Sequence, residues 1–395
     1  MPRTVITNAS VVLPDRLAKG CVVAFEDGRI TAICPTGGLP APAAEEVVDA
    51  KGSFLAPGFI DLHFHGSGEF LIDNGPDDLI GLCKLLPRYG VTGFLAGVCP
   101  QPKGQDARFL ASLAVADTQG AEILGFHLEG PFLAMTGALP PEAIGCNDPQ
   151  RVRALIEAAG PRRAVFSVSP DFEGILDLLG MMTAGSVPAF MTHTAASVTQ
   201  TQAAIEAGVR HATHFYDVFP VPPETEPGAR PCGVVEAVLA DPRVTVDFVL
   251  DGVHVDPVAV KMALQCKGPG GVSLITDANV GAGLPPGRYD SFGTSVEFAY
   301  LGAPARLTED SPRSGCLAGS GLTMDLAVRN AIELLGVDLP QAVRMAGANP
   351  AEVLGLGGCK GQIKEGFDAD LVLLDESLKV RQTWVGGECV FDEQA

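Results

Sequence analysis

The sequence predicts a (β/α)8 barrel joined to a small β-sandwich domain, and two observations indicate this fold class. In the middle of the chain, eight short β-rich segments alternate with amphipathic helical segments between residues 58 and 278. At the two ends, residues 1–56 and 361–392 alternate apolar and polar side chains, a pattern typical of strands. Strands that alternate with helices form parallel sheets, and eight such units close into a barrel.

The eight predicted strands are rich in β-branched and aromatic residues. They cover residues 58–65, 91–98, 121–129, 163–169, 187–194, 209–215, 243–250 and 271–278. Between them, stretches such as 77–90, 149–160 and 198–208 place apolar residues at three- and four-residue spacing, which predicts helices. A doubly wound open sheet is the alternative, but no G-x-G-x-x-G or Walker loop follows an early strand.

The alternating segments at the two ends predict a second domain. Turn signals such as Asp27-Gly28 separate their strands. We expect residues 1–56 and 357–395 to form one small β-sandwich domain, with a catalytic barrel of residues 57–356 inserted between them.

Composition limits the compartment and the partners. The chain has 395 residues, a formal net charge of −20 and ten cysteines that form no C-x-x-C pair. The negative charge repels polyanions, so neither nucleic acid nor an anionic membrane is expected as a partner. No apolar run reaches the roughly 18 residues of a membrane span and no signal peptide is recognisable, so we expect a cytoplasmic protein with reduced, mostly buried cysteines.

Side chains that can bind metals occur where the predicted strands end. They are His63 and His65 after the first strand, Glu129 after the third, His193 after the fifth, His214 after the sixth, His254 after the seventh and Asp277 after the eighth. A barrel gathers the carboxyl ends of its strands at one mouth, so these side chains are expected to converge. Mixed histidine and carboxylate ligands suit zinc, with iron, manganese and cobalt as alternatives, and we expect no thiolate among them.

Strand geometry distinguishes the histidines from one another. His63 and His65 are two residues apart, so they face the same side and can chelate one ion. His211 and His214 are three residues apart and face opposite sides of a regular strand. We expect His214 to be the ligand and His211 to point outward or to pack against a helix. His127 shares the parity of Glu129, so we expect it to point inward and to support the ligands.

Several longer motifs resemble those of a known family. They are APGFIDLHFHG (56–66), GFHLEGPF (125–132), MTHTAAS (191–197), ATHFYDV (212–218), DGVHVDP (251–257), LITDANVGAGLPPGRY (274–289) and LAGSGLTMDLAVRNAIE (317–333). They resemble the amidohydrolase superfamily and, within it, the N-acetylglucosamine-6-phosphate deacetylase family, over nearly the whole chain. The resemblance implies a (β/α)8 TIM barrel with a small β-sandwich and a metal-dependent hydrolase that acts on a linear amide.

The resemblance also implies residue roles. Glu129, His193 and His214 match the principal metal site of the family. His63 and His65, with Glu129 as a bridge, match a second site, so one or two divalent ions are expected. Asp277 is expected to contact the metal and to move the proton of the attacking water, and His254 to steady the substrate carbonyl. The fourth predicted strand has no lysine to be carboxylated, which argues against dihydroorotase- and hydantoinase-like activities.

Three positions depart from the family pattern where the sugar phosphate is held. The Gly-Ala-His of the family reads Gly-Ala-Leu at 137–139, its Asn is replaced by Asp217, and the arginine of its Arg-Glu-Pro-Gly is replaced by Thr225. Arg230 is a candidate replacement. Because a carboxylate near a phosphate is unfavourable, we hypothesise that the chemistry is kept while the substrate has shifted, for example to an unphosphorylated N-acyl amino sugar. The predicted substrate-binding residues are Ala138, Asp217, Val218, Arg230 and His254.

The leading functional hypothesis is a metal-dependent deacetylase. Its substrate would be N-acetylglucosamine 6-phosphate or a close analogue, and its products acetate and a free amine. A deaminase or cyclic-amide hydrolase is the alternative within the fold, which the H-L-E-G-P motif disfavours. A non-catalytic scaffold is the other alternative, which the complete set of ligands disfavours. The resemblance further implies a homodimer.

Overall fold

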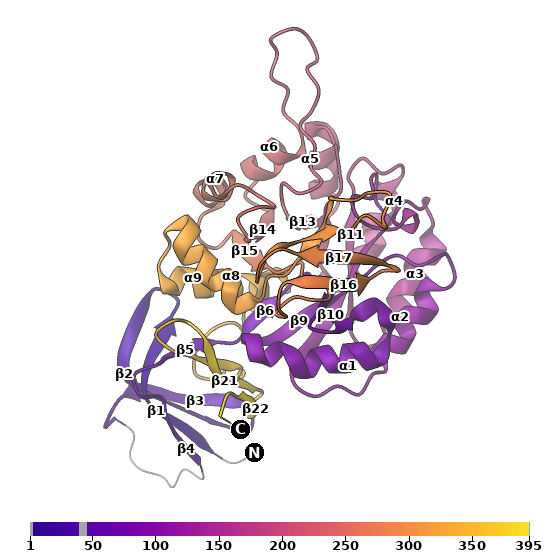
Figure 1. Ribbon diagram of the computed structural model, residues 1–395. Helices are drawn as coiled ribbons and strands as arrows, with labels where there is room; N and C mark the ends of the chain where they lie inside the picture. The colour runs from indigo at the N-terminus through magenta and orange to yellow at the C-terminus, as the bar shows by residue number, and fades with distance from the viewer. Residues whose placement is uncertain (1–2, 39–45, 395) are drawn as a thin grey trace.

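The computed structural model describes residues 3–38 and 46–394, and a barrel of eight parallel strands forms its centre. The strands are hydrogen-bonded in the order β15-β14-β13-β12-β11-β10-β9-β6 (Figure 1). Their bounds are β6 Phe59–Asp61, β9 Val91–Val98, β10 Glu122–Phe132, β11 Arg163–Val168, β12 Ala189–Met191, β13 Val209–Ala212, β14 Thr245–Val249 and β15 Val272–Ile275. Each strand overlaps one of the eight predicted segments, so the predicted barrel is confirmed.

Helices surround the barrel. They are α1 Pro76–Leu85, α2 Asp106–Ala114, α3 Pro149–Ala158, α4 Ile175–Met182, α5 Val198–Glu206, α6 Val234–Ala240, α7 Pro257–Lys267, α8 Met324–Asn330, α9 Leu339–Ala346 and α10 Ala348–Val353, with 3-10 turns at Ile72–Asn74, Leu86–Tyr89, Pro141–Ala143 and Ala184–Ser186 and a π-helical turn at Ala331–Leu335. Polar caps begin several of them: Ser197 forms a capping box with Gln200 at α5, and Asp148 caps α3. Within residues 3–38 and 46–394, no helix has both the length and the apolar character of a membrane span.

The barrel is joined between β15 and β6 by contacts just beyond the two strands. Asp277 N donates to His63 O at 2.9 Å, and Thr276 Oγ1 donates to Asp61 Oδ2 at 2.6 Å. Burial raises the pKa of Asp61 to about 7, against the hydrogen bonds from Thr276 and His63 N. These contacts fix the first and eighth strands in register, so residues that follow either strand meet at the same mouth.

Both ends of the chain contribute to one further sheet. From the N-terminal part come β1 Thr4–Leu13, β2 Arg16–Glu26, β3 Arg29–Pro35, β4 Glu46–Asp49 and β5 Phe54–Pro57, and from the C-terminal part β20 Leu371–Leu374, β21 Val380–Val385 and β22 Glu388–Asp392. The order is β22-β21-β20-β5-β1-β2-β3, with β4 beside β1, and β5 pairs antiparallel with β20. The sheet has its own core around Trp384 and Phe25. The predicted small β domain from both termini is confirmed. Its boundaries, residues 1–56 and 357–395, stay a prediction. Residues 39–45 of the predicted domain lie outside the described residues.

A third sheet was not predicted. It consists of β16 Gly287–Ser291, β17 Thr294–Phe298, β18 Pro304–Leu307 and β19 Leu317–Ser320 in antiparallel order, and a two-stranded ribbon joins β7 Gly66–Ser67 to β8 Phe70–Leu71. The larger sheet follows the eighth barrel strand and packs a small core around Val296 and Phe298. Figure 1 shows it in orange against the barrel.

Lys360 connects the barrel with the terminal sheet. Its ammonium lies 2.8 Å from Glu122 at the start of β10, 2.9 Å from Asp368 and 2.7 Å from Asp370, which precedes β20. Burial would lower the pKa of Lys360, but the carboxylates of Asp370 and Glu122 outweigh it and raise that pKa. Lys360 is therefore charged at neutral pH and neutralises a partly buried acidic cluster, in which Asp370 is the most buried carboxylate.

Replacing Lys360 with Met should lower the free energy of unfolding by about 3–5 kcal/mol, because the buried Asp370 loses its counter-ion. The exposed Lys364 in the same segment provides the matched control. Lys364→Met should change the free energy by about 1 kcal/mol or less. Urea denaturation at pH 7 measures both variants, and equal small changes would contradict the role given to Lys360.

Candidate active site

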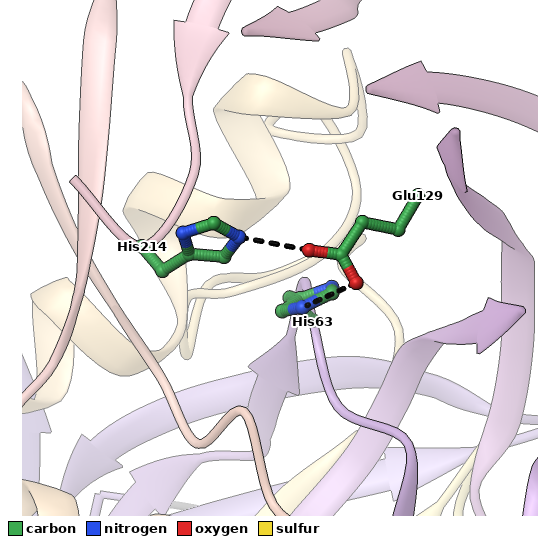
Figure 2. Close-up of side chains that lie close together, drawn as sticks. All are labelled: His63, Glu129 and His214. Carbon is green, nitrogen blue, oxygen red and sulfur yellow. Dashed lines mark hydrogen bonds and ion pairs between the residues drawn. The ribbon is translucent and has the colours of Figure 1, made fainter. Parts of the chain in front are cut away.

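Glu129 lies at the centre of the histidines at the barrel mouth. It is carried by β10 and its side chain is 3% exposed. Its Oε1 lies 2.9 Å from His214 Nε2 and 3.2 Å from His193 Nε2, and its Oε2 lies 3.2 Å from His65 Nε2 and 3.7 Å from His63 Nε2. In Figure 2, dashed lines join one carboxylate oxygen of Glu129 to His214 and the other to His63. Each oxygen of this one carboxylate therefore faces its own pair of histidines.

Asp277 lies beside the pair His63 and His65. Its Oδ1 is 3.3 Å from His63 Nε2 and 3.7 Å from His65 Nε2. The candidate ligand atoms of these three residues lie within 4.8 Å of one another, as do those of His63, Glu129 and His214. The structure thus brings together the six residues predicted as metal ligands, and His63 and His65 face the same side as expected.

Three of these residues share an unusual backbone conformation. The φ angle is +50° at His193, +34° at His214 and +43° at Asp277, a region that residues other than glycine occupy rarely and at a cost. Each residue lies two positions beyond the last residue of its strand, β12, β13 or β15. The turn that leaves each strand thereby redirects the side chain toward the mouth.

The expectation that His211 points outward or packs against a helix is wrong, because its contacts are with residues of strands β12 and β14. His211 is fully buried, with Nε2 2.8 Å from Asp247 Oδ2 and Nδ1 2.6 Å from Thr245 Oγ1, and its ring packs on Phe190. Asp247 Oδ1 also accepts a hydrogen bond from His214 N. The parity argument assumed a regular strand as far as His214, whereas β13 ends at Ala212 and the positive φ at His214 breaks the alternation. His211 supports the backbone of a candidate ligand and lies outside the ligand groups.

His127 points inward and supports His63, as expected. Its Nδ1 lies 2.7 Å from His63 Nδ1, and its Nε2 contacts Ser167 Oγ. Burial, and then the neighbouring His63, lower the pKa of His127 well below its usual value. A neutral His127 with its proton on Nε2 donates to Ser167 and accepts from His63 Nδ1. This tautomer leaves the lone pair of His63 Nε2 free for a metal ion.

His254 presents a buried nitrogen without a partner. Its Nδ1 lies 2.6 Å from Asp251 Oδ2, its side chain is 1% exposed, and Nε2 has no hydrogen-bond partner among the described residues. Burial would lower the pKa of His254, but Asp251, and then Asp217 and Asp277, outweigh it and raise that pKa. Buried polar atoms are almost always paired, so this nitrogen needs a partner that the described residues do not supply.

The buried carboxylate of Glu129 at the barrel mouth requires compensating positive charge. Burial would raise the pKa of Glu129, but His63 and the other imidazoles outweigh it and hold that pKa well below its usual range. Burial would also lower the pKa of His214, yet Glu129 raises it to about 10. Imidazolium protons thus supply the positive charge that the carboxylate needs. A divalent ion supplies the same charge and replaces those protons.

The donor atoms fit a divalent metal. His63 Nε2 is buried and has no hydrogen-bond partner among the described residues, although carboxylate oxygens lie 3.3 and 3.7 Å away. Imidazole nitrogens and carboxylate oxygens are ligands of zinc and of iron, manganese and cobalt. His193, His214 and Glu129 could hold one ion. His63 and His65, with Glu129 and Asp277, could hold a second.

A cavity of about 510 Å³ opens over this cluster. Of the predicted substrate-binding residues, Ala138, Asp217 and Val218 line the cavity, and His254 is not among its lining residues. Arg230 belongs to the segment between β13 and α6, part of which projects from the body (Figure 1), and its side chain is 90% exposed. Within this chain, Arg230 does not reach the cavity.

One wall of the cavity comes from the third sheet, which sequence reasoning missed. Phe292, Leu307, Arg313 and residues 317–319 line it. Gly319 has φ +74°, and a Cβ there would lie 2.6 Å from Asp277 O. The conformation and the close approach require glycine. Gly319 is visible in the sequence as the glycine of LAGS. Because the third sheet was not predicted, the sequence did not place this glycine at the cavity wall.

Two expectations about cysteine differ from the structure. Cys99 lines the cavity, with Sγ 3.6 Å from His65 Nδ1, and it forms a further group of candidate ligands with His65 and Asp73. A thiol therefore adjoins the ligands, although none was expected among them. The expectation of mostly buried cysteines is wrong, because only Cys21, Cys83 and Cys99 are buried and five of the ten are exposed.

Comparison with known proteins decides the family. Residues 54–390 match the family described as Amidohydrolase family. The chain belongs to this family. It is 35% identical to N-acetylgalactosamine-6-phosphate deacetylase of Escherichia coli O157:H7 over 92% of each chain. It is 31% identical to N-acetylglucosamine-6-phosphate deacetylase of Bacillus subtilis over 98% of this chain and 96% of the relative.

Solved structures agree with this membership. The N-acetyl-D-glucosamine-6-phosphate deacetylase of Mycobacterium smegmatis, in complex with N-acetyl-D-glucosamine-6-phosphate, aligns with a TM-score of 0.86 and 29% identity over 99% of this chain and 100% of that one. The deacetylase of Thermotoga maritima aligns with a TM-score of 0.81 and 27% identity over 98% and 100%. The predicted resemblance to the deacetylases is confirmed, and with it the enzyme class: this amidohydrolase is a metal-dependent deacetylase that acts on an amide bond.

The division of histidines about Glu129 predicts the metal content of variants of this amidohydrolase. The double variant His63→Ala/His65→Ala should lose one metal equivalent per chain and keep the other, whereas Glu129→Ala should lose both. Asp217→Asn is the matched control, because Asp217 lines the cavity outside the ligand groups. Plasma mass spectrometry of the purified proteins measures the ratio. Unchanged metal content in the double variant would contradict the two-site arrangement.

Proposed function

We propose that this amidohydrolase removes the acetyl group from an N-acetylated amino sugar 6-phosphate, with N-acetylgalactosamine 6-phosphate and N-acetylglucosamine 6-phosphate as the two candidates. The products are acetate and the free amine. One observation carries the proposal: Glu129 is shared by two pairs of histidines, with Asp277 beside one pair. The names of the relatives supply the substrate class. We infer zinc as the metal from the nitrogen-rich ligand set.

The chain's own residues supply the proton transfers. A bound divalent ion lowers the pKa of water and polarises the carbonyl. Burial would raise the pKa of Asp277, but His63 and His65 outweigh it and lower that pKa. Asp277 is therefore ionised at neutral pH and can take a proton from the attacking water and later deliver it to the departing amine. His254 donates from Nε2 to the substrate carbonyl oxygen, where negative charge develops.

The pair Asp251 and His254 predicts a pH effect. If charged His254 steadies the carbonyl oxygen, activity falls as pH rises through its pKa. Asp251→Asn removes the carboxylate that raises this pKa, so the falling limb of the kcat profile should move to lower pH. We also expect kcat at neutral pH to fall about 10- to 100-fold, because the ring loses its orienting partner. A reduced kcat with an unmoved limb would contradict this role.

A substrate panel tests the proposed reaction. Acetate release should be measured with N-acetylgalactosamine 6-phosphate, N-acetylglucosamine 6-phosphate and both unphosphorylated sugars. We expect kcat/KM to be highest for one of the two sugar phosphates. The two sugar phosphates differ only in the configuration at C4, so a difference in kcat/KM between them would show that the enzyme distinguishes this position. Ammonia release in place of acetate would favour the deaminase alternative, and no product from any sugar would overturn the proposal.

A second candidate substrate is the unphosphorylated sugar. Asp217 and Leu139 both line the cavity at positions where the family pattern has an amide and an imidazole, and a carboxylate disfavours a nearby phosphate. A kcat/KM for an unphosphorylated sugar that equals or exceeds the value for its phosphate would favour this candidate. We also propose that the protein forms a homodimer, on the basis of the family resemblance alone.

A further inference from the structure

Among the described residues, the cavity has a single side chain of permanent positive charge. Glu129, Asp217 and Asp277 bring carboxylates to its lining, and Arg313 is the one lysine or arginine among its lining residues. Metal ions at the histidines would offset Glu129 and Asp277, while Asp217 lies outside the ligand groups. An anionic substrate group that enters this cavity therefore meets one cationic side chain of this chain.

Arg313 lies between two loops that form the cavity wall. It belongs to the segment between β18 and β19, and it contacts the loop after β10, which is about 175 residues earlier in the chain. Its Nη2 donates to Ala138 O at 2.8 Å and to Leu139 O at 3.3 Å, and its Nη1 donates to Gly137 O. A guanidinium carries five N–H donors. These three contacts leave two donors for a ligand.

The loop that Arg313 contacts adjoins the metal ligands. At Gly137, φ is +54°, and a Cβ there would lie 2.7 Å from His193 Cε1 and 3.1 Å from Val218 Cγ2. The backbone of residues 137–139 therefore runs from the His193 side of the cluster to Arg313. A substrate with its amide at the cluster would extend along this backbone toward the guanidinium.

The contacts coincide with the sequence departures. Residues 137–139 are the segment where the family pattern has Gly-Ala-His and this chain has Gly-Ala-Leu, and Thr225 replaces the arginine of a second phosphate-holding motif. Arg230, the other candidate, does not reach the cavity within this chain. The chain thus lacks the family's histidine at position 139 and its arginine at position 225. The guanidinium of Arg313 instead lies against the backbone of residues 137–139.

We propose that Arg313 binds the phosphate of the amino sugar 6-phosphate and so determines selectivity for the phosphorylated substrate. The proposal rests on the proposed deacetylase function. The free N–H groups, one on Nε and one on Nη1, can each donate a charge-assisted hydrogen bond to a phosphate oxygen. The carbonyl oxygens of residues 137–139 hold the guanidinium plane in place, so less side-chain freedom is lost when the phosphate binds.

Steady-state kinetics of Arg313→Gln tests this role. The variant should lose about 10- to 100-fold in kcat/KM for the phosphorylated sugar, mainly through KM, which is the effect of removing one charge-assisted contact. Its kcat/KM for the unphosphorylated sugar should stay within about threefold of the parent value, a margin well below that effect. Arg313→Lys should recover part of the loss, because it restores the charge without the donors of the guanidinium group.

Two further variants sharpen the comparison. Arg288→Gln is the matched control: Arg288 is on β16 of the same sheet and pairs with Glu309 outside the cavity lining, so both rates should be unchanged. Arg230→Gln tests the rival residue. Equal losses on both substrates in Arg313→Gln would overturn the proposal in favour of a purely structural contact between the loops. Loss of phosphate selectivity in Arg230→Gln alone would overturn it in favour of Arg230.

Calorimetric titration with inorganic phosphate separates this proposal from the reaction itself. Phosphate should bind the parent protein and the Arg288→Gln variant, and binding should weaken about tenfold or more in Arg313→Gln. This result in a protein that deacetylates no sugar would sink the proposed function and leave the anion site standing. Equal phosphate affinity in the parent and in Arg313→Gln would overturn the anion site, whatever the activity.

Discussion

The buried carboxylate of Glu129 is the constraint on which the active site depends. A carboxylate 3% exposed is costly unless positive charge surrounds it, and here imidazoles from three different strand ends meet its two oxygens. That meeting requires β6, β10, β12 and β13 to end at one level. The contacts between Asp61 and Thr276 and between Asp277 and His63, which fix β6 against β15, are therefore part of the site as well as of the barrel.

Polar contacts continue inward from the ligands. His127 and Ser167 hold the far side of His63, and Asp247 joins the backbone of His214 to the ring of His211. Each link satisfies a buried donor or acceptor that would otherwise be expensive. The positive φ at His193, His214 and Asp277 is a further cost that the fold bears at this mouth. Rigid support of this kind keeps ligands in a fixed geometry before a metal binds.

The two ends of the cavity differ in how closely they follow the family pattern. At the amide end, every ligand position of the motif is present, and Asp277 lines the cavity beside the ligands. At the other end, Leu139 and Asp217 replace an imidazole and an amide, and the segment between two strands of the third sheet brings Arg313 to the wall. If the reaction depends on the first end and substrate choice on the second, as we propose, the chemistry can stay constant while the substrate changes.

The sequence by itself determined the barrel strands, the terminal β domain and the six candidate ligands, because strand periodicity and the strand-end rule are local patterns. It gave the wrong orientation for His211, because a single positive φ at His214 breaks the alternation on which parity depends. It also missed the third sheet and the contact of Arg313 with residues 137–139. Only the tertiary structure decided these, since they join segments far apart in the chain and no local pattern encodes which distant backbone a side chain will meet.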